Sequence, residues 1–232
     1  MSYPALLFLQ DLTGGSEFID WEWLRENFWE DIVPAVQGHI FLSFISIAIA
    51  LVISLPVGVL SARYRKIYPP VTFVTGVLYS VPSLAMFAIL VAAGISIGPT
   101  PVIIALVVYS LLILIRNTVA GLDSVPPETI DAARGMGLTD RQILVRVELP
   151  LALPIIVAGI RIAVVTIIGI ATIGAYVNGG GLGKLIFDGI NRQFPTMIIA
   201  GAVLATALAI VADLLLLAIE RYLRPWARAR RA

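Results

Sequence analysis

Long apolar segments, separated by short polar or glycine- and proline-containing stretches, dominate the chain. A helix that crosses the hydrocarbon core of a membrane needs about 20 predominantly apolar residues. Five segments near that length run over residues 39–62, 70–93, 101–115, 151–176 and 195–219. Because backbone groups in lipid must bond within their own segment, each segment is expected to be helical. The pattern therefore predicts an all-α, polytopic membrane protein with about five transmembrane helices.

The connections between these segments divide the chain into three regions. Residues 1–37 are expected to form an N-terminal segment outside the membrane, 38–220 a transmembrane domain, and 221–232 a basic tail. Within the transmembrane domain, the polar stretch 121–150 is the longest interruption. It is therefore the segment in which chemistry or partner recognition is sought first.

Composition supports a membrane protein and excludes several classes of function. Hydrophobic residues make up 59% of the 232 residues and charged residues only 13%, whereas soluble domains are roughly 45–50% apolar. The net charge is +1 and the basic residues form no stripe between exposed aromatics, which argues against nucleic-acid binding. There is no cysteine, so disulfides and thiolate metal sites are excluded. The first residues lack a basic region and a cleavage pattern, so no signal peptide is expected.

The positions of Lys and Arg predict the orientation, because positive residues are retained on the cytoplasmic side of short loops. If the C-terminus is inside, twelve of the sixteen basic residues face the cytoplasm: Arg63, Arg65, Lys66, Arg116, Arg134, Arg141, Arg146, Arg221, Arg224, Arg228, Arg230 and Arg231. Only Arg25, Lys184 and Arg192 would lie outside. We therefore expect the N-terminus outside and the C-terminus inside.

The residues before the first predicted span are acidic and aromatic. Residues 18–33 resemble an amphipathic helix at the outer interface, where tryptophan and other aromatic rings gather. The simpler interpretation of this helix is an ordinary membrane anchor without a recognition function.

The polar stretch 121–150 has the pattern of two short helices joined by a glycine turn. Pro126 and Pro127 cannot continue a helix but suit the first turn of a new one. Gly135 and Gly137 are expected to end it. The following Thr139 begins a Thr-x-x-Gln capping box for the second helix.

The end of this stretch contains two further prolines. Leu149-Pro150 and Pro154 are expected to break the chain again where it re-enters the membrane. The prediction is a helix, a glycine turn and a helix that project together from the inner face.

The stretch resembles the EAA loop of ABC importer permeases, a pattern of Glu-Ala-Ala, three residues, Gly, nine residues and Ile-x-Leu-Pro. Here 131–133 is Asp-Ala-Ala, Gly137 follows at the family spacing, and 147–150 is Val-Glu-Leu-Pro. The resemblance implies the type I (MetI-like) permease fold and a loop that docks in a groove of a cytoplasmic ATPase subunit. The residues it implicates in coupling are Glu128, Asp131, Ala132, Ala133, Arg134, Gly135, Gly137, Leu138 and Thr139. An unrelated amphipathic loop is the alternative.

The similarity extends over roughly residues 41–217, to permeases of glycine betaine, carnitine and choline importers, the osmoprotectant branch. It implies a quaternary-ammonium solute, captured outside by a separate binding protein through cation–π attraction. It also implies two copies of an ATPase partner that binds ATP and Mg²⁺, no cofactor in this chain, and a second permease chain, identical or paralogous. Another small solute such as an amino acid is the alternative, and a stand-alone secondary transporter is less favoured because few ionisable groups lie within the spans.

A glycine-rich segment follows the fourth predicted span. Its residues Asn178, Gly179, Gly180, Gly181 and Gly183 superficially resemble a phosphate-binding loop, but the required Ser or Thr after Lys184 is missing. A flexible break before a short outer helix is the simpler interpretation. We also consider that these glycines allow an outer gate to open and close.

Two opposite charges lie within predicted spans. Arg161 in the fourth and Asp213 in the fifth lie at similar depth, and an unpaired charge in a span is costly. Three arrangements are considered. Arg161 and Asp213 form an ion pair within the bundle, the Arg161 side chain extends to the membrane interface, or the two residues line a pore. His39, the only histidine, is expected at the membrane interface without a ligand or catalytic role.

Overall fold

The computed structural model describes residues 19–222, and every regular element in that part is helical. Its elements in chain order are α2 (Trp21–Glu26), the π-helix η1 (Phe28–Ile32), α3 (Val33–Arg63), α4 (Tyr68–Ser80), α5 (Ser83–Ala92), α6 (Pro99–Asp123), α7 (Pro127–Gly135), α8 (Asp140–Ile143), the π-helix η2 (Leu144–Glu148), α9 (Leu149–Ile173), the 3-10 helix η3 (Gly174–Val177), α10 (Leu182–Asn191) and α11 (Pro195–Tyr222). Four helices in this part are long and apolar enough to cross a membrane, or five if a bent pair counts as one span. The predicted all-α membrane fold is confirmed.

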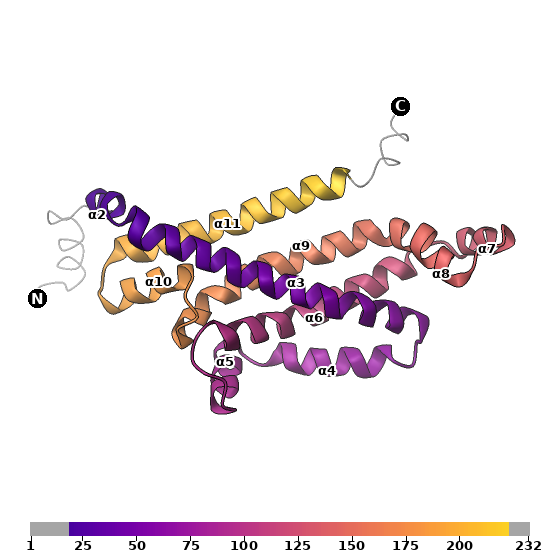
Figure 1. The fold of residues 1–232 in the computed structure, drawn as a ribbon, viewed down its shortest axis with the longest axis horizontal. Helices are drawn as coiled ribbons and strands as arrows, with labels where there is room; N and C mark the ends of the chain where they lie inside the picture. The colour runs from indigo at the N-terminus through magenta and orange to yellow at the C-terminus, as the bar shows by residue number, and fades with distance from the viewer. Residues whose placement is uncertain (1–18, 223–232) are drawn as a thin grey trace, which may run out of the picture.

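The long helices run along one axis of the molecule (Figure 1). Helices α2 and α10 lie at one end, called the α10 end below, and α7 and α8 project from the other, called the α7 end. Helix α6 packs along both α3 and α9, while α11 packs against α9 and α10. The centre of the bundle is therefore formed by α3, α6 and α9.

Glycine and small residues allow α6 to approach its two neighbours closely. A Cβ at Gly58 of α3 would lie 2.6 Å from the Thr118 side chain of α6. A Cβ at Gly159 of α9 would lie 2.3 Å from Asn117. Small residues are the usual means of close helix packing where lipid removes the hydrophobic drive between helices. These contacts make α3, α6 and α9 one tightly packed unit.

The first long helix starts earlier than the sequence predicted. It is continuous from Phe28 to Arg63, so the predicted start at residue 39 is wrong. The amphipathic helix expected over 18–33 is confined to α2, which Asp20 caps by accepting a hydrogen bond from Trp23 N at 2.8 Å. Glu30 and Asp31 lie in the first turn of η1, where the long helix begins, and carboxylates stabilise helix N-termini. The residues before 19 lie outside the described part.

The second predicted span, 70–93, is broken in two. Helices α4 and α5 meet at an angle of 95°. Pro82 has no N–H to continue the helix, and Val81 before it is extended, with φ −66° and ψ 127°. The Tyr109 hydroxyl on α6 donates a 2.7 Å hydrogen bond to the Val81 carbonyl at the break. The next helix, α6, is longer than the predicted 101–115 and includes Arg116 and Asn117.

The chain break predicted at Leu149-Pro150 and Pro154 is wrong. The helix runs without interruption from Asp140 through η2 into α9. Pro150 lies in the first turn of α9, after a π-helical segment, and Pro154 removes one hydrogen bond without ending the helix. Packing holds the helix together here, because Ala152 is fully buried and a Cβ at Gly121 of α6 would lie 3.0 Å from its carbonyl oxygen.

Candidate functional site

The predicted helix–turn–helix between the third and fourth spans is present at the α7 end (Figure 1). We call α7, the turn and α8 the hairpin. Gly137 at the turn has φ +81°, a conformation that favours glycine. The capping box is also present: Thr139 N donates to Gln142 Oε1 at 2.8 Å and Gln142 N to Thr139 Oγ1 at 3.4 Å. The local sequence signals therefore gave the correct hairpin.

The hairpin presents most of the predicted coupling residues to its surroundings. Ala133 is buried and Leu138 half-buried, whereas the others are exposed: Glu128, Asp131, Ala132, Arg134, Gly135, Gly137 and Thr139. Arg134 lies 3.4 Å from Asp131 and 3.7 Å from Asp140. The exposed side of α7 therefore carries charged and small side chains, whereas Ala133 lies on its buried side.

Sequence reasoning missed one residue of this surface. Met136, at the turn between the two glycines, is 73% exposed. A flexible, polarizable methionine at an exposed tip suits a protein-binding surface. Its position between Gly135 and Gly137 is the signal that could have found it.

The glycine segment at the α10 end is constrained rather than loose. Asn178 has φ 58°, and Gly180 and Gly181 have φ +81° and +74°. A Cβ at Gly179 would lie 2.5 Å from Val102, and one at Gly183 would lie 1.8 Å from the Thr172 carbonyl oxygen. Most of these positions thus need glycine for backbone conformation or close packing.

His39 fixes the end of the glycine segment, a role that sequence reasoning did not anticipate. It lies well inside the continuous first helix, not at its start, and is fully buried. Nδ1 accepts a hydrogen bond from Leu182 N at 3.2 Å, and Nε2 lies 3.0 Å from the Ile168 carbonyl. This set of partners matches the neutral tautomer with the proton on Nε2. His39 therefore links α3 to both α9 and α10.

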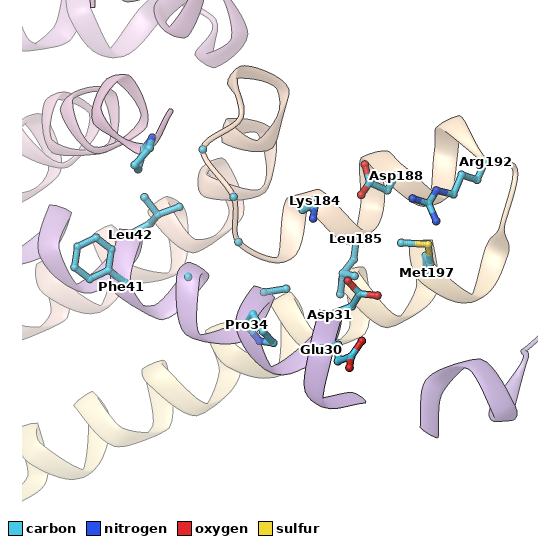
Figure 2. Close-up of a pocket in the computed structure, with 16 residues that line it drawn as sticks. Glu30, Asp31, Pro34, Phe41, Leu42, Lys184, Leu185, Asp188, Arg192 and Met197 are labelled. Carbon is cyan, nitrogen blue, oxygen red and sulfur yellow. The ribbon is translucent and has the colours of Figure 1, made fainter. Parts of the chain in front are cut away.

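A pocket of about 410 Å³ lies beside the glycine segment. Figure 2 shows Lys184, Asp188 and Arg192 along α10 on one side, and Glu30 and Asp31 on the first long helix on the other. The floor is formed partly by Gly179 to Gly181. The α10 end thus combines a charged pocket with the constrained segment.

The structure brings Arg161 and Asp213 together. Arg161 Nε lies 2.8 Å from Asp213 Oδ1, and Nη2 lies 2.9 Å from Oδ2, a bidentate pair between α9 and α11. Arg161 Nη1 also lies 3.3 Å from Glu220 Oε2. Sequence reasoning missed Glu220, although its spacing of seven residues from Asp213 puts both on one face of a helix. These contacts fix the faces that α9 and α11 present to each other.

Within residues 19–222, no group of three or more His, Asp or Glu side chains could hold a metal ion. The close charged groups in this part are instead ion pairs between helices or within the hairpin. The features that remain as functional candidates are an exposed docking surface at one end and a constrained backbone segment at the other.

Comparison with known proteins places these features in a family. Residues 54–229 match the family model described as binding-protein-dependent transport system inner membrane component. The chain is 39% identical over 201 residues to the carnitine transport permease protein OpuCB of Listeria monocytogenes, covering 87% of this chain and 91% of that protein. It is 42% identical over 195 residues to the glycine betaine/carnitine/choline transport system permease protein OpuCD of Bacillus subtilis, covering 84% and 85%.

The fold agrees with these sequence relationships. An inward-facing structure of the MetNI methionine ABC transporter contains a chain that superposes with a TM-score of 0.72 at 28% identity, covering 82% of this chain and 95% of that one. That agreement confirms the predicted type I importer permease fold. The protein, a multi-pass inner-membrane protein, therefore belongs to the family of binding-protein-dependent transport system inner membrane components, the permease subunits of ABC importers.

Proposed function

We propose that this permease moves a quaternary-ammonium osmoprotectant of the glycine betaine, carnitine or choline type into the cell. The observation that carries the proposal is the set of relatives about 40% identical over more than four fifths of the chain. Those relatives are named for carnitine, for choline, for glycine betaine or for osmoprotectant import. The similarity covers 81–87% of the chain in these four relatives, so it extends over most of the membrane domain.

The α7 end is proposed to face the cytoplasm, with the C-terminus inside and the N-terminus outside. Among described residues, positive charges gather at this end: Arg63, Arg65, Lys66, Arg116, Arg134, Arg141, Arg146 and Arg221. The α10 end has only Arg25, Lys184 and Arg192, beside carboxylates such as Glu30 and Asp31. Retention of positive residues inside supports this orientation. The basic tail predicted over 221–232 lies outside the described residues from 223 onward.

The hairpin is the proposed docking site for the ATPase subunit. Its exposed small residues, such as Ala132 and Gly135, permit close approach of another protein, while Asp131 and Arg134 supply charge. In this arrangement two ATPase subunits bind ATP and Mg²⁺, and this chain hydrolyses nothing. This chain forms the translocation path, and its hairpin receives the movement of the ATPase subunits.

The remaining partners are a second permease chain, identical or paralogous, and a separate solute-binding protein that delivers the solute at the α10 end. The charged pocket beside Gly179 to Gly181 lies where that delivery would occur. The glycine segment with α10 is the proposed outer gate, which His39 holds in the arrangement seen here.

Uptake of labelled solutes tests the substrate. The chain is expressed with its ATPase and binding protein in cells that lack other osmoprotectant transporters. Uptake of glycine betaine, carnitine or choline, with excess methionine failing to compete, is the expected result. Uptake of labelled methionine, without uptake of any quaternary ammonium compound, would instead favour an amino-acid importer of the kind that the solved relatives represent.

Co-purification tests the docking site. The wild-type permease should bring down an ATPase subunit, and Ala132→Trp on the exposed face of α7 should abolish this. Ala202→Trp, at an exposed alanine of α11, is the matched control and should leave the complex intact. A permease that purifies alone but still transports would support a stand-alone transporter instead.

A further inference from the structure

Arg63, the last residue of α3, and Arg65, in the turn that follows it, reach both chain segments that connect the hairpin to the bundle. Arg63 Nη2 lies 2.7 Å from Glu148 Oε2. Arg65 forms two contacts with Asp123, Nη1 to Oδ2 at 2.9 Å and Nη2 to Oδ1 at 2.5 Å. Asp123 is the last residue of α6, and Glu148 is the last residue of η2. The ion pairs therefore hold the two roots of the hairpin to the end of α3 and the turn after it.

The hairpin itself has few other attachments. Helix α7 packs mainly on α8 and on η2. A push on α7 must therefore pass through its roots, where the two ion pairs lie. A cavity of about 240 Å³ between the arginines, the roots and Ile130 leaves room for the hairpin to shift.

The pair between Arg63 and Glu148 is partly buried. The Glu148 side chain is only 8% exposed, and a carboxylate removed from water must be paired. Glu148 also ends a π-helical segment, a local widening that is often found at functional positions. Arg63 thus holds the point at which the hairpin becomes α9.

The pair between Arg65 and Asp123 constrains orientation more than it contributes to stability. The Arg65 side chain is 60% exposed, so it contributes little to stability by itself. Its bidentate contact nevertheless sets the relative orientation of two planar groups. The two pairs thus lie on opposite roots of the hairpin, one partly buried and one exposed.

We propose that Arg63 and Arg65 are positioning residues that transmit movement of the hairpin to α3, and through its close packing on α6 to the whole bundle. This inference rests on the proposed role of the hairpin in docking the ATPase. It predicts that loss of the pairs uncouples ATP hydrolysis from transport while the complex stays assembled.

The test measures solute moved per ATP hydrolysed in the reconstituted complex of permease, ATPase and binding protein. Two variants remove the pairs separately: Arg63→Ala with Glu148→Gln, so that no bare carboxylate stays buried, and Arg65→Ala. Each should keep the ATPase bound and hydrolysing. The transport ratio should fall by about fivefold or more for the first variant, the lower end of typical coupling between sites.

Two further variants make the result specific. Lys66→Ala removes a positive charge from the same loop, and Lys66 forms no ion pair with the described residues, so the ratio should not change. Arg65→Asp combined with Asp123→Arg restores the pair in reverse and should recover the ratio.

The inference is overturned if both pair-removing variants transport with the wild-type ratio, or if they lose the ATPase, which would make the arginines assembly contacts. Failure of the wild-type permease to bind an ATPase is a different result, since it refutes the proposed function itself. If the double variant of Arg63 and Glu148 does not fold, the exposed Arg65→Ala variant decides: a lower ratio with the ATPase bound supports the inference, and a wild-type ratio or loss of the ATPase overturns it.

Discussion

Replacement of His39 by Phe tests how firmly the glycine segment is held. Phenylalanine keeps a ring of similar size in the buried site but has no nitrogen to accept the hydrogen bond from Leu182 N. The Ile168 carbonyl lies within α9 and has its helical partner as well, so its loss is smaller. The amide of Leu182, the first residue of α10, has no such alternative within its own helix.

The expected effect on local stability is the cost of leaving the Leu182 amide without its acceptor. A buried donor left without its acceptor costs about 1–3 kcal/mol. If the segment opens locally, a loss of about 2 kcal/mol corresponds to roughly 30-fold weaker protection of this amide. The change should be confined to the start of α10.

Hydrogen exchange of the permease complex in lipid nanodiscs measures this directly. Peptides covering residues 180–186 should exchange about 30-fold faster in His39→Phe, whereas peptides from the middle of α6 serve as the internal reference. His39→Gln, whose amide can both accept and donate, should give a smaller change. Unchanged exchange at 180–186 in His39→Phe would refute the view that His39 holds the segment.

Two other predictions concern packing and charge. Gly183→Ala would place a Cβ 1.8 Å from the Thr172 carbonyl; this should destabilise the fold by about 3 kcal/mol, the upper part of the range for overpacking. Gly169→Ala, where nothing lies within 4 Å of the added Cβ, should leave the stability unchanged. The thermal unfolding temperatures of the two variants test this difference. Asp213→Asn should lower the melting temperature by breaking the bidentate contact to Arg161. Restoration by the reversed pair, Arg161→Asp with Asp213→Arg, checks this, and a reversed pair no more stable than either single change would count against it.

The features predicted best from the sequence were those determined by neighbouring residues. The hairpin begins at a proline pair, turns at Gly137 and starts again at the Thr139 capping box, all within a few positions. Apolar length likewise located the long helices, because lipid leaves the backbone no other solution.

The wrong predictions concern positions whose structure depends on contacts with distant parts of the chain. Pro82 breaks a helix and Pro154 does not, and the difference lies in what surrounds them. The Val81 carbonyl at the first proline finds the Tyr109 hydroxyl, whereas α9 around the second packs along α6. His39 was placed at the interface because its partners, far along the chain, have no signature near residue 39.

The bond between Tyr109 and Val81 has a consequence for any attempt to redesign this protein. The phenol donates a hydrogen bond to a carbonyl that the bend between α4 and α5 leaves without its helical donor. Straightening α4 and α5 by replacing Pro82 would let the Val81 carbonyl rejoin its own helix and would leave the hydroxyl without an acceptor in a nonpolar setting. We therefore expect the effects of substitutions at Pro82 and Tyr109 to be non-additive, because both positions act on the Val81 carbonyl.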